Sequence, residues 1–129
     1  MATVNLEGQG IVVDTSLDCI TIRQHLSGKA GGAALDVTGF KPTVIKAGHV
    51  VIKETATGTY KPMPVNEAGS AYAALPAGHT YYGVVVSSRP TAQPAVAIMY
   101  RGEVNENSSP YPVTAEIKAA LSKIEFTHD

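Results

Sequence analysis

Two apolar runs, Tyr81-Tyr82-Gly83-Val84-Val85-Val86 and Ala95-Val96-Ala97-Ile98-Met99-Tyr100, decide the fold class of this chain. Both runs are short and rich in β-branched and aromatic residues, which is typical of strands. A strand with one face in water alternates apolar and polar residues, and these two runs do not. We therefore expect two strands that are buried on both faces.

Shorter extended segments surround these runs. Val44–Lys46 and Val50–Glu54 flank Ala47-Gly48-His49, and the same tripeptide recurs at Ala77-Gly78-His79, again just before an apolar run. A glycine at this position suits a type II turn, whose third residue has positive φ. Tyr60–Val65 contains two prolines, which predicts a strand at a sheet edge.

The C-terminal region predicts one helix. After Pro110-Tyr111-Pro112, Thr114 can cap a helix over 115–124, with one apolar face made by Val113, Ile117, Leu121 and Ile124. The fold class we predict is therefore mainly β, a small β-sandwich or a partly open β-barrel with one C-terminal helix.

The first 34 residues differ in character from the rest. Gly10–Val13 and Cys19–Arg23 have the composition of strands, and the small residues of Ser27–Ala34 resemble a linker. We interpret residues 1–34 as an extended arm or β segment ending in a Gly/Ala-rich linker, and residues 35–129 as a β-rich domain. The arm's strands could equally pair within the domain's own sheet.

Composition excludes several classes of function. A net charge of −1, the absence of Trp and the lack of Lys/Arg clusters near aromatic residues argue against nucleic-acid binding. No apolar stretch approaches the roughly 18 residues that cross a membrane, and the N-terminus has no signal-peptide pattern. The single cysteine, Cys19, lies in an apolar run and is expected to be a buried thiol of a protein made in a reducing cytoplasm.

No catalytic or metal-binding pattern can be assembled from the sequence. The four histidines are scattered, and His49 and His79 are expected to be solvated turn residues, with convergence as a minor alternative. A hydrolase or lyase site made of Glu103, His49 and His79 is the weakest hypothesis. We expect a protein that is not an enzyme and that uses no cofactor and no metal.

The order of segments from Lys41 to Phe126 resembles that of a known family. The C-terminal part resembles the head decoration proteins of tailed bacteriophages through Val96–Asn105, Pro110-Tyr111-Pro112-Val113 and the helix. The segments before it resemble the same group in their order, which is Ile45–Gly48, Gly58–Pro64 and Tyr82–Val86. The resemblance implies a β-domain on the capsid exterior, made in the host cytoplasm, that binds the major capsid protein and stabilises the mature head. Members of this group are often trimers, and monomers exist. No nucleic-acid or membrane partner is implied.

The N-terminal apolar residues are the candidate capsid-binding residues: Ile11, Val12, Val13, Ile20 and Ile22. An arm of this kind could add a strand to an exposed sheet edge of the capsid. Tyr60, Tyr72 and Tyr111 are candidate interface anchors. The alternative function is a carbohydrate- or host-surface-binding module of a virion fibre, with an aromatic platform from Tyr81, Tyr82 and Tyr100.

Overall fold

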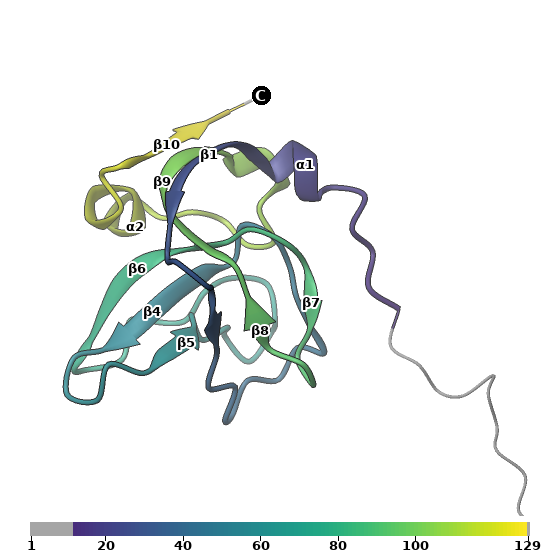
Figure 1. Ribbon diagram of the computed structural model, residues 1–129. Helices are drawn as coiled ribbons and strands as arrows, with labels where there is room; N and C mark the ends of the chain where they lie inside the picture. Colours follow the sequence, from purple (N-terminus) through teal and green to yellow (C-terminus); the bar gives the residue numbers. More distant parts are fainter. Residues whose placement is uncertain (1–11, 129) are drawn as a thin grey trace, which may run out of the picture.

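The protein is described by a computed structural model that covers residues 12–128. The fold is mainly β (Figure 1). Its main sheet has six strands. Five of them follow the order β1 (Ile22–Gly28), β9 (Ile98–Asn105), β6 (His79–Val85), β4 (Val50–Glu54) and β5 (Tyr60–Pro62), with antiparallel neighbours. The sixth, β10 (Ile124–Thr127), pairs with β9 in parallel.

Two small sheets and three short helical segments complete the structure. β2 (Ala33–Ala34) pairs with β8 (Ala95–Val96), and β3 (Val44–Ile45) pairs with β7 (Arg89–Pro90). The helical segments are α1 (Asp18–Thr21), the 3₁₀ turn η1 (Glu106–Ser108) and α2 (Ala115–Ala120). Within residues 12–128 there is no helix long and apolar enough to cross a membrane.

The central strands are buried on both faces, as the two apolar runs predict. On β4, Val50 and Ile52 belong to one core cluster, whereas Val51 between them belongs to the other. β6 and β9 divide their side chains between the two clusters in the same way. Because successive side chains of a strand point to opposite faces, the sheet separates two cores. The prediction is confirmed for the first run. In the second run it holds only for Ile98 and Met99 on β9, because Ala95 and Ala97 are exposed and the run is divided between β8 and β9.

The predicted turns and the predicted edge strand are also confirmed. Gly48 and Gly78 both have positive φ, 88° and 74°, so each Ala-Gly-His tripeptide forms a turn before a strand. β5 is the last strand of the sheet and ends at Pro62, where the missing N–H of proline is tolerated.

The C-terminal helix is shorter than predicted. The side chain of Thr114 accepts a hydrogen bond from the N–H of Ile117 at 3.3 Å, so the predicted cap is correct. The helix ends at Ala120, and Ile124 reaches the core from β10 instead of from a third helical turn. Ile117 and Leu121 are buried in the first core cluster, as the apolar face predicts.

The N-terminal region shows the largest differences from expectation. The predicted strand over Cys19–Arg23 is wrong for its first half, because residues 18–21 form α1, and β1 begins only at Ile22. β1 pairs with β9, so the main sheet includes residues from both sides of position 34. The small residues of 27–34, which we interpret as a linker, form the end of β1, a turn and β2.

Candidate partner-binding surface

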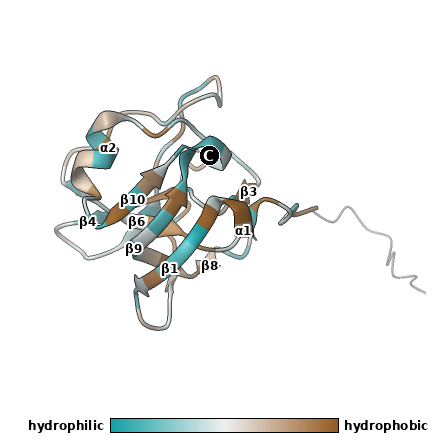
Figure 2. Cartoon of the chain, turned by 90° about the horizontal axis from the view of Figure 1, so that it is seen from above, coloured by the Kyte–Doolittle hydropathy of each residue, from teal (hydrophilic) through white to brown (hydrophobic). Residues whose placement is uncertain are grey.

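The exposed large apolar side chains in residues 12–128 all belong to the N-terminal part of the sequence. Four of them are 48% to 87% exposed, and all precede residue 27: Val12, Leu17, Ile20 and Leu26. In Figure 2, α1 and the chain just before it are largely brown, the colour of apolar residues. Single exposed apolar residues are normal on a soluble protein, but a gathering of them marks an interaction site. We call these four side chains the N-terminal apolar group.

The single turn of α1 divides its residues between solvent and protein. Leu17, at the N-cap, and Ile20 are exposed, whereas Thr21 is only 1% exposed. Residues three apart share a face of a helix, so Leu17 and Ile20 point outward together, and Asp18 and Thr21 point inward. The Thr21 hydroxyl donates to the carbonyl of Ser108 at 3.1 Å.

Asp18 attaches α1 to the loop that follows β6. Its carboxylate accepts one hydrogen bond from the Ser88 N–H at 2.8 Å and another from the Ser88 hydroxyl at 2.6 Å. The same hydroxyl oxygen accepts from the N–H of Ala47 at 3.0 Å. Hydrogen bonds to an ionised carboxylate are among the stronger ones in proteins. α1 is therefore held in place while Leu17 and Ile20 remain available to a partner.

The turn at Gly48 fits closely under α1. A Cβ atom at Gly48 would lie 2.5 Å from Cγ2 of Thr21, closer than any real contact of this kind. The positive φ of Gly48 already disfavours other residues. Glycine thus suits this position both for its backbone conformation and for the close contact with Thr21 of α1.

A hollow of about 240 Å³ lies beside α1. It is lined by apolar and polar groups, among them Leu17, Thr21, Lys46 and Ser109. The Ser109 hydroxyl is buried and has no hydrogen-bond partner within residues 12–128. This hydroxyl oxygen has almost no exposed surface, so it lies behind the wall of the hollow.

The five predicted capsid-binding residues take different positions. Ile11 lies outside the described residues. Val12 and Ile20 are exposed, Val13 is half-buried, and Ile22 opens β1, where it pairs with Val104 and packs against the first core cluster. Val12 and Ile20 are accessible to a partner, whereas Ile22 serves the protein's own sheet.

Two exposed residues and one thiol were not anticipated. Leu17 and Leu26 belong to the N-terminal apolar group although their sequence neighbourhood gives no separate signal for exposure. Cys19 is exposed, so the prediction of a buried thiol is wrong. The apolar run around Cys19 predicts burial only if it forms a core strand, and α1 instead turns Cys19 and Ile20 to the surface.

His49 is a buried core residue, which contradicts its prediction as a solvated turn histidine. Its Nε2 lies 2.9 Å from the carbonyl oxygen of Met63, and its ring is surrounded by those of Phe40, Tyr72 and Tyr111, with centroids 5.2 to 5.6 Å away. A carbonyl oxygen can only accept, so Nε2 carries the proton. Burial lowers the pKa of His49 to about 4, and the imidazole is neutral at neutral pH.

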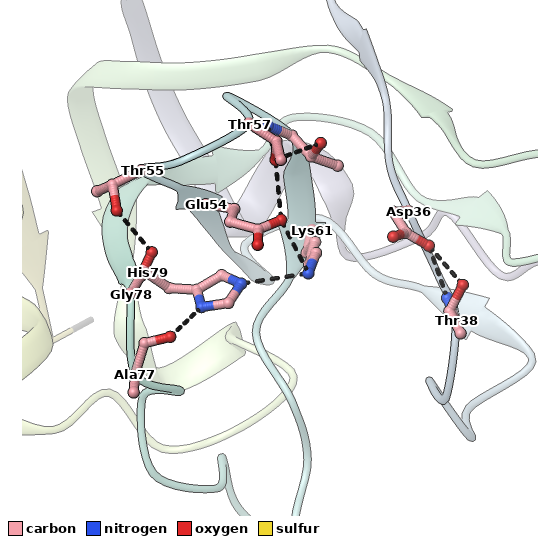
Figure 3. A network of polar contacts seen from close by, with 10 residues as sticks. Asp36, Thr38, Glu54, Thr55, Thr57, Lys61, Ala77, Gly78 and His79 are labelled. Atoms are coloured by element: carbon pink, nitrogen blue, oxygen red, sulfur yellow. Dashed lines mark hydrogen bonds and ion pairs between the residues drawn. The ribbon is translucent and has the colours of Figure 1, made fainter.

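His79 lies in a separate polar network, which Figure 3 shows. Its Nδ1 is 2.9 Å from the Ala77 carbonyl, and its Nε2 is 3.2 Å from Nζ of Lys61. Nδ1 therefore donates to the carbonyl, and Nε2 accepts from the ammonium group. Lys61 also approaches Oε2 of Glu54 at 3.5 Å. The polar atoms of His79, Lys61 and Glu54 are therefore engaged with one another.

The fold does not bring Glu103, His49 and His79, the residues of the hypothesised catalytic site, together. His79 pairs with Glu54 at one end of the β4–β6 ladder, whereas His49 precedes the Val50–Val84 pair at its other end. Glu103 lies on β9 opposite Gln24 of β1. Within residues 12–128, no group of three or more His, Cys, Asp or Glu residues could hold a metal ion.

The tyrosines divide into an inner and an outer set. Tyr72 accepts a hydrogen bond from the Val50 N–H at 3.0 Å, and burial raises the pKa of its phenol. With Tyr111, it belongs to the surroundings of His49, so neither resembles the free interface anchor that we predict. Tyr60 and Tyr82 are half-buried, with ring centroids 4.8 Å apart. Of the platform predicted from Tyr81, Tyr82 and Tyr100, the rings of Tyr82 and Tyr100 are in contact, with centroids 6.0 Å apart, whereas Tyr81 packs against the other core cluster.

Comparison of the chain with protein-family models, with curated proteins and with solved structures finds no match.

Proposed function

We propose that this chain is an auxiliary (decoration) protein of a tailed-bacteriophage head, which binds the outer surface of the major capsid protein lattice. The order of segments from Lys41 to Phe126 supports the family, and the N-terminal apolar group supports attachment to a protein partner. The role involves no catalytic step, cofactor, nucleic acid or membrane. The protein is made in the host cytoplasm and resides on the virion exterior.

The observation that carries the proposal is the joint exposure of Leu17 and Ile20 on one side of α1, with the exposed Val12 in the segment before it. Complete burial of a Val, Leu or Ile side chain contributes about 1.5–3 kcal/mol, and these side chains are already partly covered, so each would contribute about 1 kcal/mol on binding. Their sum is modest for one molecule. On a shell that binds many copies, it still shifts the equilibrium toward the intact mature lattice, because the dissociated subunits are not bound.

The hollow beside α1 also supports attachment of a partner at this surface. Leu17 lines this hollow and also belongs to the N-terminal apolar group, so a capsid loop lying on the group would reach the hollow as well.

The finer architecture and assembly are part of the proposal. A small β-sandwich or a partly open β-barrel suits a sheet with a core cluster on each face. Residues 35–129 would be the decoration domain and 1–34 its attachment segment, although the part from Ile22 onward also completes the sheet. We further propose a trimer, which sedimentation velocity of the free protein would detect.

The test is co-sedimentation of the purified protein with mature capsids of its phage. We expect saturable binding, and at least tenfold weaker binding of the double variant Leu17→Ser/Ile20→Ser. A matched control, Ala92→Ser/Ala119→Ser, changes two exposed positions elsewhere and should bind as the unmodified protein does. Protein that remains wholly in the supernatant would refute the capsid role. Deleting residues 1–16 is a cleaner second variant than deleting 1–34, since it spares α1 and β1.

A further inference from the structure

Three tyrosines from three strands form a row on the surface. Tyr60 lies on β5, Tyr82 on β6 and Tyr100 on β9, and the ring centroids are 4.8 Å apart for the first pair and 6.0 Å for the second. All three rings are half-buried, so part of each ring faces solvent. A row of partly exposed aromatic rings offers a large, rigid contact area at little cost in conformational entropy.

Two lysines reach over this row. Nζ of Lys29, from the turn after β1, lies 5.5 Å from the centroid of Tyr60, and Nζ of Lys53 lies 5.4 Å from that centroid and 6.0 Å from that of Tyr82. An ammonium group at this distance is attracted by the ring. We call these five residues the aromatic–lysine face: Lys29, Lys53, Tyr60, Tyr82 and Tyr100.

The positive charge of this face is not neutralised by carboxylates in the described part of the chain. Within residues 12–128, Lys61 pairs with Glu54 and Lys118 pairs with Glu106, and neither Lys29 nor Lys53 takes part in an ion pair. The nearby carboxylate of Glu54 is engaged by Lys61 and by the Thr57 hydroxyl. The Lys29 ammonium donates one hydrogen bond to the Gly32 carbonyl at 3.1 Å, and an ammonium group has three donors. Both ammonium groups therefore retain donors and an unneutralised charge for an anionic ligand.

A hollow of about 240 Å³ continues the face at Tyr82 and Tyr100. Tyr81, Leu121 and Lys123 also line it, which adds a third ammonium group. Its volume is below the roughly 300–1,000 Å³ of pockets for drug-sized ligands, so it suits one ring-sized group of a longer molecule. Burial and the neighbouring Tyr60 raise the pKa of Tyr82 to about 12, so its phenol keeps the proton that it can donate.

We propose that the aromatic–lysine face binds an acidic oligosaccharide, with its sugar rings against the tyrosines and its carboxylate or sulfate groups at Lys29 and Lys53. The arrangement of the rings favours a sugar over single-stranded nucleic acid. The planes of neighbouring rings meet at 71° and 65°, so they do not form the parallel platforms on which successive bases stack.

The part of the face around Lys53 lies far from α1, which carries Leu17 and Ile20. In Figures 1 and 2, α1 and the C-terminal end of β4, which carries Lys53, are at opposite sides of the molecule. A protein attached through α1 would thus keep this part of the aromatic–lysine face open to solvent. The sugar-binding proposal does not depend on the capsid role, and it is tested on the free protein.

The experiment is titration of the free protein with a heparin-derived hexasaccharide and with sialyllactose, against lactose and maltohexaose as neutral counterparts. We expect binding to at least one acidic sugar and at least tenfold weaker binding to the neutral ones. Lys29→Gln/Lys53→Gln should weaken acidic-sugar binding at least tenfold. The matched control Lys61→Gln, next to Tyr60 on β5 but engaged with Glu54, should not change it.

Three outcomes would overturn the proposal. They are no binding of either acidic sugar at millimolar concentration, equal binding by the Lys29→Gln/Lys53→Gln variant, and equally tight binding of a thymidine oligonucleotide, which would indicate a general preference for polyanions. Circular dichroism of each variant confirms that the fold is retained. Because these titrations contain no capsids, their failure leaves the co-sedimentation result unaffected, and the reverse also holds.

Discussion

The carboxylate of Asp18 accepts two hydrogen bonds from Ser88, one from its N–H at 2.8 Å and one from its hydroxyl at 2.6 Å. This contact joins the one-turn helix α1 to the loop between β6 and β7. A helix of one turn has almost no intrinsic stability, since nucleation is unfavourable. The position of the exposed residues Leu17 and Ile20 therefore depends on contacts such as this one.

Replacing Asp18 with Ala should release α1. The loss of two charge-assisted hydrogen bonds at a partly buried site should lower the free energy of unfolding by about 1–3 kcal/mol, which urea unfolding measures. Proteolysis after Leu17 should also become faster. Asp14→Ala is the control, because Asp14 is exposed and its carboxylate bonds to the Ser16 N–H of its own turn, whereas its bond to Lys46 uses the backbone carbonyl that alanine keeps. Equal stability of the two variants would show that the Ser88 contact does not hold α1.

Replacing Gly48 with Ala should be more harmful than replacing Gly78. Both glycines have similar positive φ, but a Cβ at Gly48 would clash with Thr21, whereas nothing lies within 4 Å of a Cβ at Gly78. Gly78→Ala should cost about 1 kcal/mol for the backbone conformation, and Gly48→Ala about 1–3 kcal/mol more. Thermal unfolding of both variants gives the difference. Identical losses would mean that α1 moves aside freely.

The buried His49 should make stability depend on pH. Its pKa of about 4 in the folded protein lies below the 6.5 of an unfolded chain, so between these values the unfolded state binds a proton that the folded state does not. The stabilisation is complete above pH 6.5 and is lost as pH falls toward 4, up to about 3 kcal/mol. Urea unfolding at pH 7.5, 5.5 and 4.5 would follow this loss.

The same pH series on two variants identifies the group responsible. His49→Gln keeps a donor for the Met63 carbonyl but cannot be protonated, so its stability should change little between pH 7.5 and 4.5. His79→Gln, at a residue that is not buried, should retain the pH dependence of the unmodified protein. A His49→Gln variant that still loses stability over this range would assign the effect to other groups.

The exposed thiol of Cys19 provides a direct probe of the partner-binding surface. In the free native protein, we expect maleimide to label Cys19 at nearly the rate seen in urea, because the residue is exposed on α1. Saturation with mature capsids should slow labelling at least tenfold if α1 is covered. Unchanged labelling of protein that does co-sediment would place the contact elsewhere on the molecule.

The central strands could be predicted from sequence because their signal is local. A run such as Val84-Val85-Val86 has no polar residue that could face water, so burial on both faces is the arrangement that fits it. The turns at Gly48 and Gly78 and the cap at Thr114 are local in the same sense, since each depends on residues a few positions away.

The candidate surface could not be predicted in full, because it depends on contacts between distant segments. Residues 19–23 have the composition of a strand, but the bonds of Asp18 to Ser88 and of Thr21 to Ser108 hold residues 18–21 as a helical turn. The same contacts turn Cys19 and Ile20 outward. His49 likewise follows a turn signal in the sequence, and only the rings of distant aromatic residues show that it is buried.

The small residues of 27–34 show how composition can mislead. A Cβ at Gly28 would lie 2.3 Å from the carbonyl oxygen of Ile98, and one at Gly32 would lie 2.4 Å from that of Val96. Side chains are absent here because two backbones approach closely. In sequence, such a requirement has the same appearance as a linker.

Strand β9 hydrogen-bonds to β1, β6 and β10, so the first and the last strands of the main sheet both depend on it. During synthesis, β1 leaves the ribosome long before β9 exists, and β10 follows β9. The main sheet therefore cannot close until residues up to Thr127 have been synthesised, and pairings between such distant segments form slowly. Until then, Leu17 and Ile20 are carried on a chain that has no fixed shape to present them, so a nascent copy has no completed partner-binding surface.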